Sequence, residues 1–253
     1  MFYFFMAPIL TYNWLLIIAA VAPAVYLMVK VYKLDRLDKE SPMMLRSMVT
    51  GGILSSLLAM IIERVLSLLL GIFVPAGTAL YSVLLYFVVV GFTEEGSKYF
   101  MLNRRTWYSV EFNCLYDGVV YAAFTSLGFA LWENISYVLH YGFSTALVRA
   151  VTAIPGHTCF GIFMGVFYGC ARGYAYLQEE TKSKVFRILC VFIPALIHGA
   201  YDYIASMQTP NAEWIFLVFI LCLFVVSYLL AKRMSKNDRY FYMDRRNNRF
   251  WEL

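Results

Sequence analysis

Charged residues are scarce in this chain. Of its 253 residues, 15% are charged and 61% are hydrophobic, and the formal net charge is +5. A soluble domain needs more polar surface than this to cover its core, so a water-soluble globule is excluded. Apolar runs of about 20 residues, long enough to cross a bilayer, recur along the sequence. The sequence therefore predicts an all-α membrane protein with about seven transmembrane helices.

The apolar runs follow one another with short polar connections. They lie at about residues 13–29, 47–74, 79–102, 117–138, 149–172, 187–206 and 214–231. Because no long low-complexity segment or soluble stretch separates them, residues 1–253 are expected to form a single polytopic membrane domain. A basic tail follows the last run, at residues 232–253.

Lysine and arginine are almost missing from alternate loops. Most of the 21 basic residues lie in three connections and the tail, at residues 30–46, 104–105, 172–187 and 232–253. The loops near residues 75, 141 and 208 have none. Basic loops remain on the cytoplasmic side, so the amino terminus is predicted outside and the carboxyl terminus inside. The tail is typical of an anchor on the lipid bilayer, and no nucleic-acid binding is expected.

Paired cysteines are also absent. The five cysteines show no C-x-x-C spacing, which excludes a zinc ribbon and gives no sign of a disulfide framework. The chain has only three histidines, and two of them, His157 and His198, fall inside apolar runs. His140 lies in a loop and is not expected to act in a site.

Several ionisable side chains lie inside the apolar runs. They are Glu94, Glu95, Glu133, His157, His198 and Asp202, with Asp117 at the edge of a run. A charged side chain in hydrocarbon costs about 3 kcal/mol or more unless it is paired or lines a wet cavity. This accumulation therefore indicates an active site built within the membrane.

The first motif is the sequence Glu94-Glu95-Gly96-Ser97-Lys98. Glu94 and Lys98 are four residues apart and share one face of a helix. Two carboxylates beside one ammonium group can divide their roles, one held ionised by the lysine and the other suited to proton transfer. The alternative is a buried ion pair that only fixes the helix register.

The next two spans carry one motif each. Glu133-Asn134 adjoins a stripe of small residues, so Glu133 is expected to point into the bundle, either as a hydrogen-bonded interhelical carboxyl group or as part of the site. His157 lies on the same face as a glycine stripe that runs from Gly161 to Gly173. Such a stripe lets a neighbouring backbone approach closely.

The fourth motif is His198-Gly-Ala-Tyr-Asp202. A spacing of four residues lets the acid orient the imidazole, or lets both side chains coordinate one ion. With a rise of about 1.5 Å per residue, Glu95, His157 and His198 fall at compatible depths. Glu133 and Asp202 reach the same depth only if the helices tilt.

Taken in order, these four motifs resemble the PrsW-type intramembrane proteases, relatives of the CAAX prenyl endopeptidases and bacteriocin-immunity proteins. The resemblance covers about residues 92–203 and implies a multi-pass enzyme of the bacterial cell membrane with a catalytic core at about residues 79–206. It implies an intramembrane endopeptidase that makes the site-1 cut in a single-span substrate, such as an anti-sigma factor of an envelope-stress response. Lys98 and Glu133 depart from the CAAX pattern, which disfavours prenyl-protein processing.

The expected catalytic residues are Glu94, Glu95, Glu133, His157, His198 and Asp202, with Lys98 and Asn134 expected to bind substrate. Peptide hydrolysis needs an activated water, an oxyanion donor and an acid for the leaving amine. Glu94 or Glu95, assisted by His157, is predicted to be the base, and His198, oriented by Asp202, is predicted to donate to the oxyanion. Glu95, His157 and His198 could equally bind a divalent metal such as zinc. The sequence leaves a metal-dependent and a glutamate-type mechanism open.

The chain has no H-E-x-x-H, G-x-S-x-G or G-x-G-D motif, so it fits other intramembrane protease classes poorly. Two further functions use the same features. Buried acids and histidines also serve a proton- or metal-coupled membrane transporter, although no inverted repeat is visible between the two halves. The glycine stripe would also suit a non-catalytic protein that binds a partner's transmembrane helix.

Overall fold

The computed structural model describes residues 2–242, with side chains from residue 14 onward, and this part of the chain forms no strand. The helices are α1 (Phe2–Leu34), α2 (Pro42–Phe73), α3 (Ala79–Val83), η1 (Leu84–Gly91), α4 (Phe92–Thr106), α5 (Asp117–Tyr141), α6 (Phe143–Val151), α7 (Ala153–Tyr176), α8 (Glu180–Ala205) and α9 (Ala212–Lys236). The predicted all-α class is confirmed. Of the predicted basic tail, residues 243–253 lie outside the described part.

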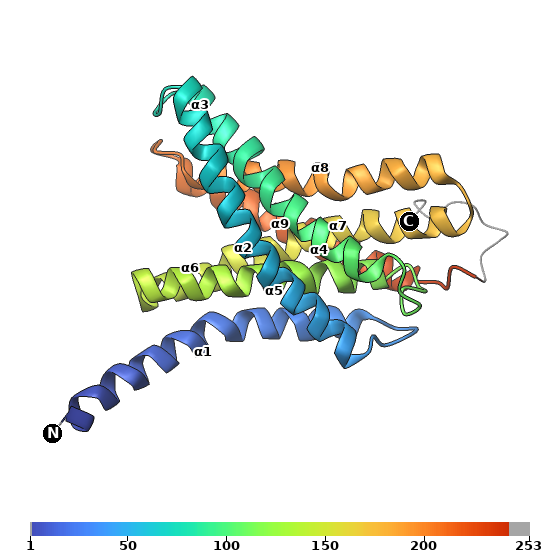
Figure 1. Ribbon diagram of the computed structural model, residues 1–253, viewed down its shortest axis with the longest axis horizontal. Helices are drawn as coiled ribbons and strands as arrows, with labels where there is room; N and C mark the ends of the chain where they lie inside the picture. The colour runs from blue at the N-terminus through green and yellow to red at the C-terminus, as the bar shows by residue number, and fades with distance from the viewer. Residues whose placement is uncertain (1, 243–253) are drawn as a thin grey trace.

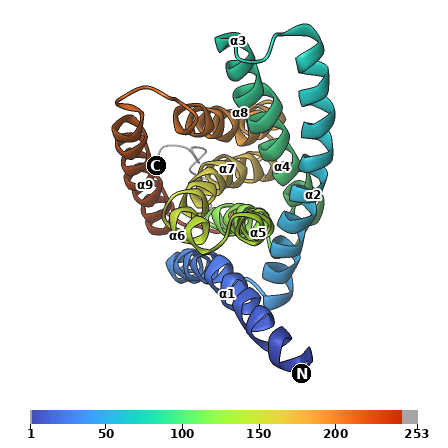
Figure 2. The ribbon, with the colours of Figure 1, turned by 90° about the vertical axis from the view of Figure 1, so that its left-hand side faces the viewer.

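The helices form one bundle around α5 and α7. Seen end-on, α1, α2, α4, α8 and α9 surround these two helices (Figure 2). Six stretches in the described residues are long and apolar enough to cross a membrane: Trp14–Leu34, Pro42–Phe73, Ala79–Thr106, Phe143–Tyr176, Glu180–Ala205 and Ala212–Lys236. With the 25-residue α5, whose first half is buried on every side, the count becomes the predicted seven.

Two predicted spans have an irregularity that the apolar pattern does not show. The third is a continuous helix from Ala79 to Thr106 whose middle, η1, has the wider turns of a π-helix. The fifth predicted span starts within α6, to which residue 149 belongs. The helix is interrupted at Thr152, and α7 begins at the next residue. Pro155 fits the first turn of α7, where its missing N–H leaves no hydrogen bond unmade. π-Helical segments often occur beside functional sites, and η1 ends three residues before Glu94.

Glycines bring α5 into backbone contact with its neighbours. A Cβ atom on Gly52 of α2 would lie 2.0 Å from the Thr125 carbonyl oxygen of α5. One on Gly165 of α7 would lie 2.5 Å from the Gly118 carbonyl oxygen. These are backbone atoms of packed helices, which cannot change rotamer to make room as a flexible side chain can. The glycine stripe on α7 therefore packs against α5, inside this chain.

Gly165→Ala is accordingly expected to lower the free energy of unfolding by about 1–3 kcal/mol, because α5 and α7 must move apart. The measurement is denaturant unfolding in detergent micelles. Gly71→Ala is the matched control, since a Cβ there meets no atom within 4 Å. Equal stability of the two variants would contradict this account of the helix contact.

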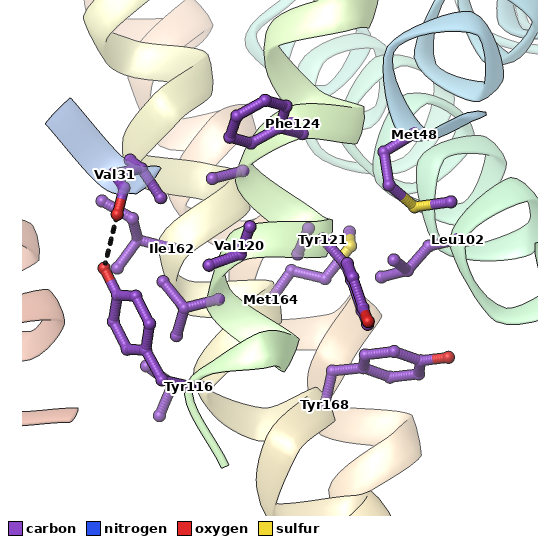
Figure 3. Close-up of a cluster of buried hydrophobic side chains, with 14 of the residues drawn as sticks. Val31, Met48, Leu102, Tyr116, Val120, Tyr121, Phe124, Ile162, Met164 and Tyr168 are labelled. Atoms are coloured by element: carbon purple, nitrogen blue, oxygen red, sulfur yellow. Dashed lines mark hydrogen bonds between the residues drawn. The ribbon is translucent and has the colours of Figure 1, made fainter. Parts of the chain in front are cut away.

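A tightly packed apolar core occupies the end of the bundle that carries the α1–α2 loop. Figure 3 shows Tyr116, Tyr121 and Tyr168 within it, and the Tyr116 hydroxyl donates to the Val31 carbonyl oxygen at 3.4 Å. The α4–α5 loop and the described end of the chain lie at the same end (Figure 1). The Phe241 amide donates to the Asn113 carbonyl oxygen at 2.9 Å. The loops predicted to be cytoplasmic thus share one end, and the chemistry-bearing residues lie elsewhere.

Candidate active site

A cavity of about 650 Å³ opens between α2, α5, α7 and α8. Tyr137 near the end of α5, Ala205 at the end of α8 and Phe216 in α9 line it, so it lies toward the loops near residues 142 and 208. Five of the predicted catalytic residues also line it: Glu94, Glu133, His157, His198 and Asp202. Helices α2 and α4 cross α5 and α7 obliquely, which brings side chains of different predicted depths together (Figure 1).

The two adjacent acids of α4 have different surroundings. Glu95 is completely buried, 2.7 Å from Lys98 Nζ and 2.9 Å from His198 Nδ1. Glu94 lies 3.3 Å from Lys98 Nζ, and its side chain is 10% exposed and faces the cavity. Glu94 is thus the acid that a substrate can reach, and Glu95 holds Lys98 and His198 in place.

Lys98 lies behind the two acids and does not face the cavity. Its ammonium group contacts Glu94, Glu95 and His157 Nδ1, the last at 3.2 Å, and lies 4.1 Å from the centre of the Phe129 ring. A buried ammonium needs this number of partners to offset the loss of its hydration. The structure thus places Lys98 among the side chains of the site, and its expected role in substrate binding stays a prediction.

His157 is fixed from α5. Its Nε2 lies 2.8 Å from the Glu133 carboxylate, and its own carbonyl oxygen accepts a hydrogen bond from Ser126 Oγ at 2.6 Å. The same carboxylate oxygen of Glu133 lies 3.1 Å from a guanidinium nitrogen of Arg149 in α6. Arg149 was not among the predicted site residues. Its signal in the sequence is a lone basic residue on the side that otherwise has none.

Asn134 is also placed differently from the prediction. It is buried, donates to the Ala20 carbonyl oxygen of α1 at 2.8 Å, and accepts a hydrogen bond from Arg149 Nε at 2.9 Å. It does not line the cavity, and its hydrogen bonds join it to α1 and to Arg149, so its expected binding of substrate stays a prediction.

His198 is held between two acids and an aromatic ring. Its Nδ1 faces Glu95, its Nε2 lies 3.5 Å from Asp202, and Phe160 stacks on the imidazole at a ring-centre distance of 4.5 Å. The rings of His198 and His157 are 5.3 Å apart. The four-residue spacing of His198 and Asp202 thus has the orienting effect that the sequence suggests.

Three side chains converge closely enough to hold a metal. One donor atom each from Glu94, His157 and His198 lies within 4.8 Å of the others. Within residues 2–242, this is the one group of three or more histidine, cysteine, aspartate or glutamate side chains whose donor atoms come this close together. Two histidines and one glutamate are a known ligand set of catalytic zinc. Carboxylates on the imidazoles, here Glu133 and Glu95, are the usual supporting partners of such ligands. The acid in this group is Glu94, whereas the sequence suggests Glu95, which is completely buried and lies between Lys98 and His198.

Comparison with known proteins identifies a family that the chain matches. Residues 39–230 match a family described as "PrsW family intramembrane metalloprotease". "Protease PrsW" of Halalkalibacterium halodurans is 31% identical over 225 residues, which cover 88% of this chain and 99% of that protein. "Protease PrsW" of Bacillus subtilis is 33% identical over 225 residues, covering 88% and 95%. "Protease PrsW" of Clostridioides difficile is 32% identical over 169 residues, covering 64% and 70%. No solved structure matches the chain.

Proposed function

This chain belongs to the PrsW family of intramembrane metalloproteases, and from that premise we propose that it hydrolyses a single-span membrane protein at the cavity between α2, α5, α7 and α8. It is an enzyme, a protease, and a multi-pass protein of a bacterial membrane. Family membership favours this activity over a transporter or a non-catalytic helix-binding protein. The observation that carries the proposed site is the convergence of Glu94, His157 and His198 on the cavity.

In this proposal Glu94, His157 and His198 are the residues that would hold a divalent metal such as zinc. When bound, such a metal would lower the pKa of a water molecule and polarise the scissile carbonyl group. The protein keeps the three ligands oriented before substrate arrives. Glu95 fixes the imidazole of His198 through Nδ1, which leaves Nε2 as the nitrogen that would face a metal, and all of these residues lie in helices.

Proton transfer is assigned to Glu133. Its side chain is 25% exposed in the cavity, its carboxylate is 2.8 Å from His157, and Arg149 provides a counter-charge that suits an ionised base. The sequence predicts Glu94 or Glu95 for this role. Glu95 is enclosed by Lys98 and His198, and Glu94 belongs to the metal set, so neither is assigned this role. Of the other cavity acids, Glu133 is the one held beside both His157 and Arg149, and it is assigned to carry a proton from water to the leaving amine.

The substrate proposed is an anti-sigma factor with one transmembrane segment. This choice rests on the resemblance of the four motifs to family members that make the first cut in such a factor. The cavity is lined by side chains of membrane-length helices, and at about 650 Å³ it has room for a short unfolded segment.

The test is reconstitution of the purified protein in liposomes with the single-span anti-sigma factor of its own bacterium, followed by mass spectrometry of the fragments. A single cut near the membrane boundary is expected, lost with a chelator and restored by zinc. A multi-span protein from the same membrane should remain intact. Proton or metal flux without any cleavage would contradict the proposal.

A further inference from the structure

Glu63 of α2 faces the catalytic cavity from the side opposite α7 and α8. Its Oε1 is enclosed and has no hydrogen-bond partner in the described part of the chain. The charged groups that act on it are those of the site, with Glu94 first, then His198 and Glu133. Its neighbour in sequence, Arg64, is exposed.

The other cavity acids already have partners. Glu94 pairs with Lys98, Glu133 pairs with Arg149, and Asp202 pairs with His198. Of the four carboxylates that line the cavity, Glu63 is therefore the one with no ion pair among the described residues. The catalytic roles assigned above do not use it.

An enclosed carboxylate beside other carboxylates is stabilised when a cation comes within contact. A polypeptide in the cavity can supply that cation from a side chain, and a basic side chain at membrane depth in turn needs an acidic partner. A substrate with an acidic side chain at the same place would meet Glu63, Glu94 and Glu133 together.

We propose that Glu63 binds a lysine or arginine side chain of the substrate segment in the cavity, so that a basic residue near the scissile bond determines which proteins are cleaved. The proposal rests on the proposed function, because it requires a polypeptide in the cavity. It assigns Glu63 a part in specificity and none in bond cleavage.

The test compares single-span substrates that differ only by lysine, leucine or glutamate at each of several positions on either side of the cut. For the wild-type protein, kcat/KM is expected to be at least about tenfold higher for lysine than for glutamate at one of these positions, equivalent to about 1.4 kcal/mol. Glu63→Gln should narrow this ratio, and Glu63→Lys should reverse it. Arg64→Gln is the matched control on the next residue and should leave the ratio unchanged.

Absence of any lysine preference in the wild-type protein, or an unchanged ratio in Glu63→Lys, would overturn the proposal. Equilibrium binding of fluorescent peptides that carry lysine or glutamate at each position is measured in parallel. If no substrate is cleaved, the proposed function fails. The peptide-binding measurement then tests by itself whether Glu63 binds a basic side chain. Tighter binding of a lysine peptide that Glu63→Lys reverses would support its role, and equal binding would refute it.

Discussion

Glu94→Gln is expected to reduce the rate of substrate cleavage about 10³-fold or more. Glu94 contributes the one carboxylate to the set of three donors that meet within 4.8 Å, and an amide is a much poorer metal ligand. The substitution preserves size, and Lys98 keeps Glu95 as its counter-charge, so the fold should be retained. The measurement is kcat in liposomes together with zinc bound per chain, and both are expected to fall.

Two variants show whether this loss is specific. Glu213→Gln alters an exposed acid in the first turn of α9 and should leave kcat and zinc content unchanged. Glu133→Gln should lower kcat about 10²- to 10⁴-fold, as expected for loss of a proton carrier. Because Glu133 also supports His157, this variant is expected to bind zinc about 10- to 100-fold more weakly and to retain it when zinc is supplied in excess. Normal cleavage by Glu94→Gln would show that the reacting bond lies elsewhere, and a normal kcat in zinc-saturated Glu133→Gln would remove Glu133 from proton transfer.

Lys98→Met is expected to destabilise the protein by about 3–5 kcal/mol, because it leaves Glu94 and Glu95 without their shared counter-charge. The chain length and volume of the side chain are nearly kept, so the loss reflects charge more than packing. The measurement is the free energy of unfolding in micelles, with activity followed in the same samples.

Removing the opposing charge as well should restore part of this stability. The double variant Lys98→Met/Glu95→Gln is therefore expected to be more stable than Lys98→Met alone, and the four proteins of this cycle give the coupling energy. Lys182→Met is the matched control, since Lys182 is an exposed residue in the first turn of α8 and should leave the stability nearly unchanged. A loss in Lys98→Met as small as in this control would mean that the buried acids do not depend on Lys98.

Apolar length predicts most of the fold, because each membrane-crossing helix must satisfy its own backbone hydrogen bonds. The break at Thr152 and the π-helical turns of η1 escape such a prediction. The π-helical segment lies against a neighbouring helix. At Gly91, the end of η1, a Cβ would lie 2.6 Å from the Ala195 carbonyl oxygen of α8, a closeness that no local pattern encodes.

Spacing within one helix predicts which site residues share a face, and this holds for Glu94 with Lys98 and for His198 with Asp202. It does not predict how far one helix is rotated or shifted against another. The rotation and shift of α4 against α8 determine that Glu95 contacts His198 and that Glu94 faces the cavity.

The same limit explains the residues that the sequence misplaces or misses. Lys98 and Asn134 look accessible in a linear motif but are enclosed by other helices. Glu63 appears in the sequence as one member of the adjacent pair Glu63-Arg64, and Arg149 as a single basic residue at the start of a predicted span; only the packing of α2 and α6 brings Glu63 and Arg149 to the cavity.

The central claim is that Glu94, His157 and His198, from three different helices, form one metal-dependent catalytic centre. The most direct measurement is the zinc content of the purified protein and of Glu94→Gln, His157→Ala and His198→Ala, with cleavage assayed on the same preparations. One zinc per active chain, lost together with cleavage in each of the three variants, is the predicted result. Full cleavage by a chelator-treated, zinc-depleted wild-type protein would contradict it.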